Sequence, residues 1–188
     1  MKRGLFSKVV GVSEENLKTL RRRNQLPFPL FDDDGHDEGF VAAGREPQAV
    51  FSVLDALKLR LALDMTIEGG VSPDVAAKAV SNAIGYLAGK DPFALADDPR
   101  SDDIFIGIER YRARDGKSKD YADYFGANHY AGNLRDIALE SEKRAGEDYL
   151  RSLENGESVS RMRLVLVNLS AAARDIAARA EKFGVTNA

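Results

Sequence analysis

The chain has 188 residues with 27 basic and 30 acidic side chains, and 44% of its residues are hydrophobic, which is typical of a globular protein with one compact domain or two small ones. The absence of cysteine excludes disulfides, a thiol nucleophile and cysteine-ligated zinc, and the two histidines, His36 and His129, are too few for a histidine metal cluster. No run of residues is apolar for long enough to span a membrane, and the first residues do not form a signal-peptide core. We therefore expect a cytoplasmic protein with no metal, no cofactor and no membrane partner.

The net charge of −3 is unevenly distributed along the chain. Residues 1–30 contain seven basic side chains and two acidic ones, Glu14 and Glu15, so this segment carries +5 and the remainder carries −8. A basic end on an acidic body suggests an anionic partner at one end of the molecule, although an arginine-rich helix exposed to solvent would show the same charge. The charge by itself leaves both interpretations open.

The amino-terminal residues predict two short helices joined by a tight turn. Leu5, Phe6, Val9 and Val10 recur at helical spacing, and Gly11 ends that pattern. Ser13 can cap a second helix that starts with two acidic residues and points Leu17 and Leu20 inward. Asn24 is a candidate left-handed cap, Leu26 closes the small core, and Pro27 ends the segment.

These residues resemble a known DNA-binding family. The run from Val9 to Ser13, the run from Leu17 to Asn24 and the pair Leu26-Pro27 are similar to the winged helix-turn-helix of MerR-type and excisionase-like domains, and the resemblance extends over about the first 85 residues. In this chain Leu20 stands where the family has an aromatic residue, Asn24 where it has glycine and Lys18 where it has arginine. The resemblance implies that the second helix enters a major groove of double-stranded DNA as a recognition helix.

The resemblance and the local charge together give a set of candidate DNA-binding residues. Phosphate contacts are assigned to Lys2 or Arg3 with Arg22 and Arg23, and contacts with base edges to Glu15, Asn16, Lys18 and Thr19. Ser13 completes the set in the turn before the helix. The alternative is a solvated helix end whose arginines only complement the helix dipole.

The segment from Phe28 to Val41 predicts a β-hairpin around Asp34-Gly35, at the place where the family has its wing. Family wings usually present arginines to DNA, whereas this tip is acidic and contains Asp32, Asp33, Asp34, Asp37 and Glu38. A solvated acidic turn is the favoured interpretation, because the spacing of a calcium-binding loop is not met. The hairpin could also fold over the basic helix and block it.

Two longer helices are expected next, over residues 47–68 and 73–87, the second capped by Ser72 and starting at Pro73. Arg45 and Lys58 are assigned at most a contact with the DNA backbone. Residues 89–103 have the composition of a loop or linker, so we expect a domain boundary near residue 95. The predicted domains are a DNA-binding domain over residues 1–89 and a dimerisation or sensing domain over residues 104–188.

The carboxy-terminal half predicts a small α/β unit. Ile104, Ile106 and Ile108 alternate with other residues as in a half-buried strand, and residues 162–169 are apolar on both faces, which suggests a central strand. A helix is expected over residues 133–153, and Ser170 can cap a last helix that ends at Gly184. The two strands are too few for an independent sheet, so we expect this unit to pack on the helical half or to pair in a dimer.

The expected fold class is mainly α with a small α+β carboxy-terminal part: a winged helix-turn-helix, two helices and a small α/β unit. The stretch from Tyr111 to Gly132 places aromatic residues, Asn128 and His129 on a predicted glycine-bounded loop, which could line a pocket for a small-molecule effector but more often covers the edge of a core. No nucleophile motif or phosphate-binding loop is found in the sequence, so we expect no catalytic residues and no enzyme.

The leading hypothesis is a sequence-specific DNA-binding protein, a bacterial or phage transcriptional regulator that forms a homodimer and responds to a protein or small-molecule effector. One alternative is a DNA-recruiting assembly protein such as a small terminase subunit. The other is a protein-interaction module that does not bind DNA.

Overall fold

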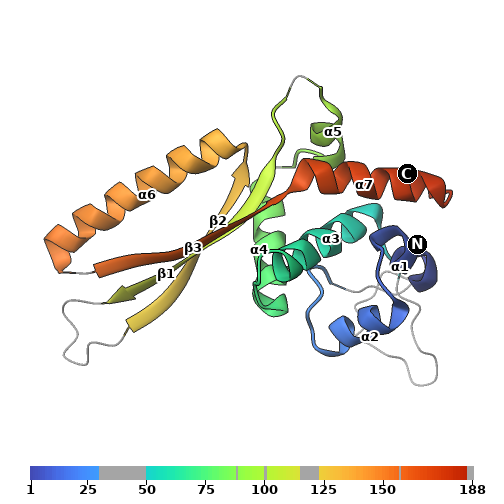
Figure 1. The fold of residues 1–188 in the computed structure, drawn as a ribbon, viewed down its shortest axis with the longest axis horizontal. Coiled ribbons are helices and arrows are strands. Elements are labelled where there is room, and N and C mark those ends of the chain that lie inside the picture. The colour runs from blue at the N-terminus through green and yellow to red at the C-terminus, as the bar shows by residue number, and fades with distance from the viewer. Residues whose placement is uncertain (30–49, 88, 100, 115–122, 157, 186–188) are drawn as a thin grey trace.

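A helical body and a projecting arm make up the fold of the computed structural model (Figure 1), which describes residues 1–29, 50–87, 89–99, 101–114, 123–156 and 158–185. The body contains α1 (Arg3–Val10), α2 (Glu14–Arg22), α3 (Val53–Ile67), α4 (Pro73–Tyr86), α5 (Pro92–Asp97) and α7 (Leu169–Lys182). The arm contains β1 (Phe105–Arg114), β2 (Asp123–Gly132), α6 (Leu134–Asn155) and β3 (Ser158–Asn168). The expected helix-rich chain with a small sheet near its carboxy terminus is confirmed.

The predicted acidic hairpin and the expected absence of a membrane-spanning helix are considered next. The hairpin with the acidic tip, expected between Phe28 and Val41, falls mainly on residues 30–49, which lie outside the described residues. Among the helices that the structure describes, none is long and apolar enough to cross a membrane.

Both amino-terminal helices are confirmed, together with the residues that end or begin them. α1 ends at Gly11, whose φ of +83° lies in the left-handed region that glycine adopts without strain. The hydroxyl of Ser13 accepts a hydrogen bond from the Asn16 N–H (3.1 Å) and so caps α2. Leu17 is buried, and Asn24 has the left-handed conformation expected of it.

α3 and α4 are confirmed, but α3 begins later than the sequence pattern suggests. Ser52 and Asp55 form a capping box, in which the side chain of each accepts a hydrogen bond from the backbone N–H of the other (3.0 and 2.8 Å). The helix therefore starts at Val53, and Val50 precedes it and is exposed. α4 starts with Pro73 at its first position as expected, whereas Ser72 makes no cap hydrogen bond.

The prediction that residues 89–103 are a plain linker is wrong for residues 92–97, which form α5. The side chain of Asp91 caps this helix by accepting a hydrogen bond from the Phe93 N–H (3.0 Å). α5 packs on α7, where the guanidinium of Arg174 donates a hydrogen bond to the carbonyl of Ala96 (3.0 Å). The packing partner is far away in the sequence, so the local composition could not reveal this helix.

The sheet is antiparallel, with the strand order β2-β1-β3. The strand predicted around Ile106 and Ile108 is confirmed as β1, but β1 is the central strand and β3, which was expected to be central, lies at an edge. β2 occupies residues that were expected to form a loop, so that prediction is corrected for residues 123–132. Glycines and Asn128 interrupt the aromatic residues of this segment, which is why it resembles a loop, and its pairing with β1 stabilises it as a strand.

The final helix is confirmed with a different cap. Asn168 accepts a hydrogen bond from the Ala171 N–H (2.8 Å), so Asn168 and not Ser170 is the N-cap of α7. The hydroxyl of Ser170 accepts instead from the backbone N–H of Ile104 (2.9 Å) and is buried. This contact ties the start of α7 to the residue before β1.

Two hydrophobic clusters hold the body together and attach the arm to it. One contains Leu57, Leu61 and Met65 of α3 together with the strand residues Ile106 and Val165. The other joins the amino-terminal helices to α3 and α7. The sheet therefore packs on the helical half, which is one of the two arrangements expected for it.

Candidate nucleic-acid interface

Three phenylalanines fix the position of α1 and α2 on the body. The rings of Phe6 and Phe51 are stacked with centroids 4.2 Å apart, and the ring of Phe28 meets both edge-on at 6.0 and 6.2 Å. All three side chains are buried in the cluster that includes Leu59 of α3 and Ile176 of α7. The unit formed by α1, the turn and α2 therefore sits on a rigid support.

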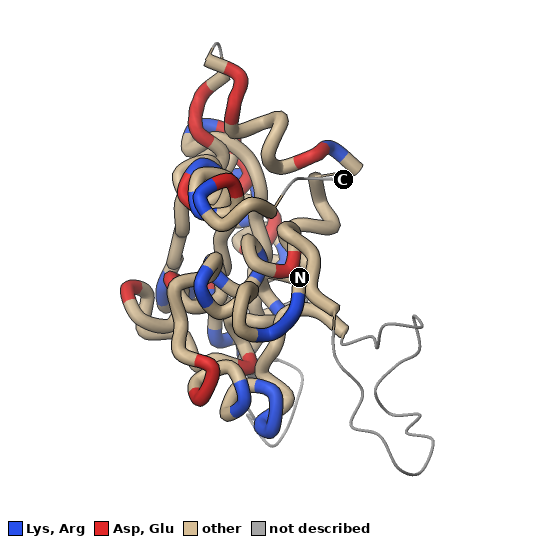
Figure 2. The backbone as a smooth tube through the Cα atoms, turned by 90° about the vertical axis from the view of Figure 1, so that its right-hand side faces the viewer, with Lys and Arg blue, Asp and Glu red and all other residues tan. Residues whose placement is uncertain are grey.

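The outer face of α2 is not covered by any of the described residues over most of its length. Leu17 is the one fully buried side chain of this helix, and Leu20 is partly buried. Lys18 and Thr19 lie three and four residues after Glu15, and Arg22 lies three residues after Thr19, so these side chains share the opposite face. α2 lies at the lower edge of the body, away from α6 (Figure 1), and basic residues gather in the same lower region in Figure 2.

The predicted base-reading residues differ in how far their polar groups are already used. The side chain of Glu15 is 76% exposed and that of Lys18 is 45% exposed, and their charged ends are 4.0 Å apart. The Thr19 hydroxyl donates a hydrogen bond to the Glu15 carbonyl (3.0 Å), and the Ser13 hydroxyl is used as the helix cap. Both hydroxyls are thus hydrogen-bonded within the helix, whereas the charged end of Lys18 has only a 4.0 Å contact with Glu15.

The predicted phosphate-binding residues lie at two separate places. Arg22 is the last residue of α2, Arg23 is its C-cap, and both are exposed. Lys2 and Arg3 lie at the start of α1, where Gly4 is close to the Glu14 carboxylate at the start of α2. The structure therefore brings Lys2 and Arg3 to one end of α2 and Arg22 and Arg23 to the other, about 13 Å away by helix length.

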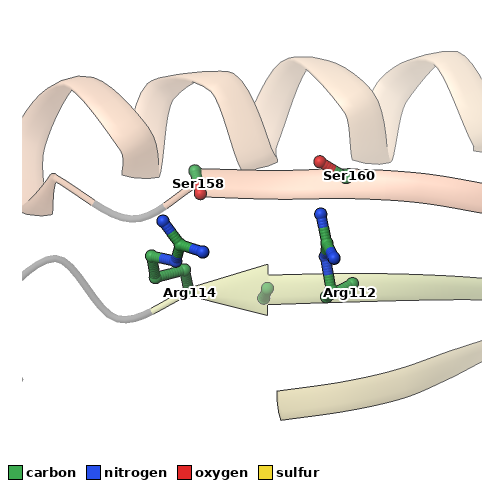
Figure 3. A pocket seen from close by; sticks show the side chains of 5 residues that line it. Arg112, Arg114, Ser158 and Ser160 are labelled. Carbon is green, nitrogen blue, oxygen red and sulfur yellow. The ribbon is translucent and has the colours of Figure 1, made fainter. Parts of the chain in front are cut away.

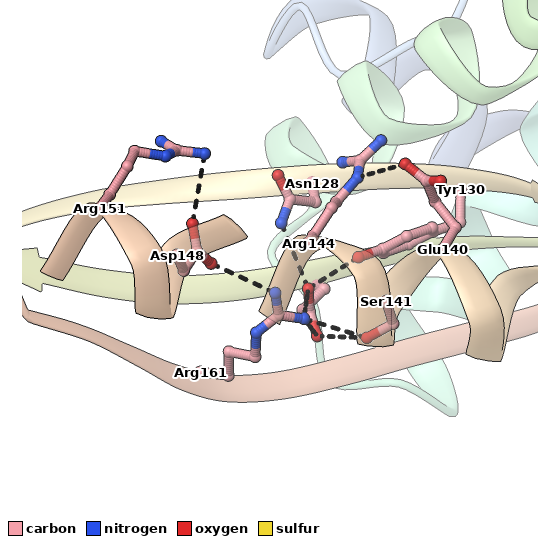
Figure 4. Close-up of polar contacts among 9 residues, drawn as sticks. Asn128, Tyr130, Glu140, Ser141, Arg144, Asp148, Arg151 and Arg161 are labelled. Atoms are coloured by element: carbon pink, nitrogen blue, oxygen red, sulfur yellow. Dashed lines mark hydrogen bonds and ion pairs between the residues drawn. The ribbon is translucent and has the colours of Figure 1, made fainter. Parts of the chain in front are cut away.

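A buried ion pair inside the arm was missed by the sequence analysis. The Glu109 carboxylate, only 6% exposed, receives hydrogen bonds from the Arg161 guanidinium (2.8 Å) and the Tyr130 hydroxyl (2.8 Å). It also accepts from Asn128 and from Ser141 of α6, both at 3.2 Å (Figure 4). A strict alternation in β1 would place Glu109 in solvent, but α6 covers that face of the sheet.

The electrostatics of this cluster indicate a structural role. Burial raises the pKa of Glu109, but the hydrogen bonds from Tyr130 and Asn128 and the charge of Arg161 outweigh it, so the pKa lies below its usual value. Burial, together with the hydrogen bond to Glu109, raises the pKa of the Tyr130 phenol. Glu109 and Arg161 therefore stay charged and Tyr130 stays neutral at neutral pH, which fits a structural role better than proton transfer. We call this cluster of Glu109, Arg161, Tyr130, Asn128 and Ser141 the clamp, because it connects α6 to the sheet.

The aromatic stretch from Tyr111 to Gly132, expected to cover a core or to line an effector pocket, forms the pairing strands β1 and β2 over its described residues. Tyr130 is buried in the clamp, and burial together with the charge of Arg144 lowers the pKa of His129. A separate open hollow of about 660 Å³ lies beside Met1, with Phe51, Ile84 and Phe93 in its wall. Within the described part of the chain, no cluster of histidine and carboxylate side chains could hold a metal ion.

No protein-family model matches this sequence, and a search of curated proteins finds no matching relative.

Proposed function

We propose that the protein binds double-stranded DNA in a sequence-specific manner through α2 and acts as a transcriptional regulator of the winged helix-turn-helix kind. The observation that carries this proposal is the outer face of α2, where Glu15, Lys18 and Arg22 are exposed while Leu17 alone is fully buried. A helix with its side chains is about 10–12 Å wide and the major groove is about 12 Å wide, so a helix supported on one side only can enter it.

The proposed contacts follow from the accessibility of each side chain. Lys18 suits the two acceptors of guanine, Asn16 suits adenine, and Glu15 can accept from the amino group of cytosine. Arg22 and Arg23 at one end of α2 and Lys2 and Arg3 at the other would hold phosphates on both sides of the groove. The Ser13 and Thr19 hydroxyls already bond to the backbone, so they contribute less to the proposed recognition.

The test begins with a gel-shift assay against genomic DNA fragments at two salt concentrations, followed by titration of a retained fragment and of its scrambled sequence. Replacing Lys18 with alanine should reduce the preference for the retained fragment, because a base contact carries sequence information. Replacing Arg22 and Arg23 with alanine should weaken binding to both DNAs and flatten the slope of log K against log salt by about 1.8. The matched control is Arg135→Ala with Lys143→Ala, two exposed basic residues on α6.

Equal binding by the parent protein and the Arg22→Ala/Arg23→Ala variant would refute the docking of α2. Absence of any salt-dependent DNA binding by the parent would favour a protein-interaction module. The mass in solution separates the remaining classes, because a dimer is expected of a regulator and a ring of many subunits is expected of a DNA-recruiting assembly protein.

A further inference from the structure

The face of the sheet that α6 does not cover carries a row of arginines toward the end of the arm. Arg110, Arg112 and Arg114 alternate along β1 and so point to the same face. Their partners on β3 are Arg163, Ser160 and Ser158, respectively. All four arginines are exposed, and we call this surface the arginine face.

Two of these arginines are cross-strand neighbours without a compensating charge. Arg110 is paired directly with Arg163, and like charges in that position destabilise a sheet. In the part of the chain that the structure describes, neither guanidinium makes an ion pair or a side-chain hydrogen bond. An anion bound between them would remove the repulsion.

A small hollow adjoins this pair on the same face. It has a volume of about 120 Å³ and is lined by Arg112 and Arg114 of β1 and by Ser158 and Ser160 of β3 (Figure 3). A guanidinium has five N–H donors and a serine hydroxyl one, so these side chains can donate to a tetrahedral oxyanion in addition to their contacts within the protein. The chemistry of the hollow fits a phosphate group.

The two sides of the arm have opposite charge. α6 contains four basic and six acidic residues and therefore carries a net charge of −2, whereas the arginine face carries four positive charges. Asp123, the single acidic residue of β2, is the register partner of Arg114, and counting it leaves three positive charges in excess at these positions. A polyanion would accordingly approach the arm from the arginine face and not from α6.

We propose that the arginine face binds the phosphate backbone of double-stranded DNA next to the segment read by α2, an inference that rests on the proposed function for its choice of polyanion. Arg110 and Arg114 are about 13 Å apart along the strand, a length that spans about four phosphates of one DNA strand. In Figure 1 α6 lies on one side of the sheet, and the body lies on the other side, with α3 and α4 between the sheet and α2. The proposal therefore requires a duplex that extends from α2 past the body to the arginine face.

The experiment measures fluorescence anisotropy of a labelled duplex of about three helical turns across a salt series. The variant is Arg110→Gln/Arg163→Gln, and the matched control is Arg135→Gln/Lys143→Gln, which makes the same charge change on α6. Two lost phosphate contacts should reduce the slope of log K against log salt by about 1.8. Raising the salt from 50 to 200 mM should then weaken binding by a factor about 12 times smaller for the variant than for the parent. The thermal midpoint of this variant should be unchanged or higher, because a like-charge pair has been removed.

The outcomes separate this inference from the proposed function. Weaker binding by the Arg110→Gln/Arg163→Gln variant with an unchanged control supports the arginine face, whatever the Arg22→Ala/Arg23→Ala variant does. Weaker binding by the α2 variant alone overturns the arginine face and leaves the proposed function standing. A larger effect of the Arg110 and Arg163 changes on an RNA duplex than on DNA overturns the choice of DNA, and absence of duplex binding by the parent overturns both proposals.

Discussion

Glu109→Gln is expected to be among the most damaging single changes in the arm, because it removes a charge from a site that the fold has organised around it. The carboxylate lies 2.8 Å from the guanidinium of Arg161 and accepts further hydrogen bonds from Tyr130, Asn128 and Ser141. The glutamine amide has nearly the same size but replaces one acceptor oxygen with a donor. At least one of these donors would then face another donor.

The structure sets the size of the effect. Removing one partner of a buried ion pair costs about 3–5 kcal/mol in the free energy of unfolding. Arg161 is 24% exposed and also bonds to Asp148 at 3.2 Å, so it is not left without a counter-charge, and we expect the lower end, about 3 kcal/mol. In a chain of this length that corresponds to a fall in thermal midpoint of about 6–12 °C.

The assay is urea unfolding of the parent, Glu109→Gln, Arg161→Met and the double variant, followed by circular dichroism. Because each single change already breaks the pair, the double variant should cost less than the sum of the two by about 2 kcal/mol. The pKa of Glu109 is lower in the folded protein than in the unfolded chain. The contribution of the Glu109 carboxylate to the free energy of unfolding is therefore fully present above the unfolded pKa of about 4.5. It is lost as the pH falls through the lower, folded pKa. The difference in free energy of unfolding between the parent and Glu109→Gln should become smaller in that range.

Two results would refute this reasoning. A Glu109→Gln variant within about 0.5 kcal/mol of the parent would mean that the clamp does not stabilise the fold. Strict additivity of the two single changes would mean that Glu109 and Arg161 act independently.

The remaining predictions concern the support of α2 and the start of α7. Phe6→Ala should cost about 3–5 kcal/mol by opening the stacked aromatic cluster, as measured by chemical unfolding, and an unchanged midpoint would contradict the role given to that cluster. Ser7→Ala should leave stability unchanged or raise it by about 1 kcal/mol, because the buried Ser7 hydroxyl has no hydrogen-bond partner among the described residues, whereas a clear loss would reveal a hidden partner. Asn168→Ala should cost about 1–2 kcal/mol, since it removes the α7 cap and the 2.7 Å hydrogen bond to Asp103, and Asp103 should then titrate closer to its usual pKa in an NMR titration.

Local signals account for what was predicted correctly at the amino terminus. Gly11 and Ser13 end one helix and start the next through their own backbone and side-chain chemistry, within three or four residues of the bonds they make. The same reasoning could have found the capping box of Ser52 and Asp55, which has the expected spacing, but the longer apolar pattern drew the predicted start of α3 too early. The start of α3 was predicted too early because the apolar pattern was given more weight than the capping box.

The interior of the arm was not predictable in this way. Glu109 and Arg161 are 52 positions apart, and nothing in the sequence near either residue marks it as buried. The arginine face arises in the same manner, because the register between β1 and β3 places Arg110 opposite Arg163. A charged residue in a strand is ordinarily assigned to solvent, and that assignment holds for Arg110 and fails for Glu109 solely because α6 covers one face.

The sequence by itself determined the two amino-terminal helices, the Ser13 cap and the outward face of α2, because these features depend on residues a few positions apart. It also determined the charge of the amino-terminal segment, which is a matter of composition. Only the tertiary structure decided the strand order, the burial of Glu109, the helix hidden between residues 92 and 97, and the side of the sheet on which four arginines meet. Those features depend on contacts between segments that are far apart in the sequence. The free energy of such a contact depends on both segments, so neither segment alone can reveal it.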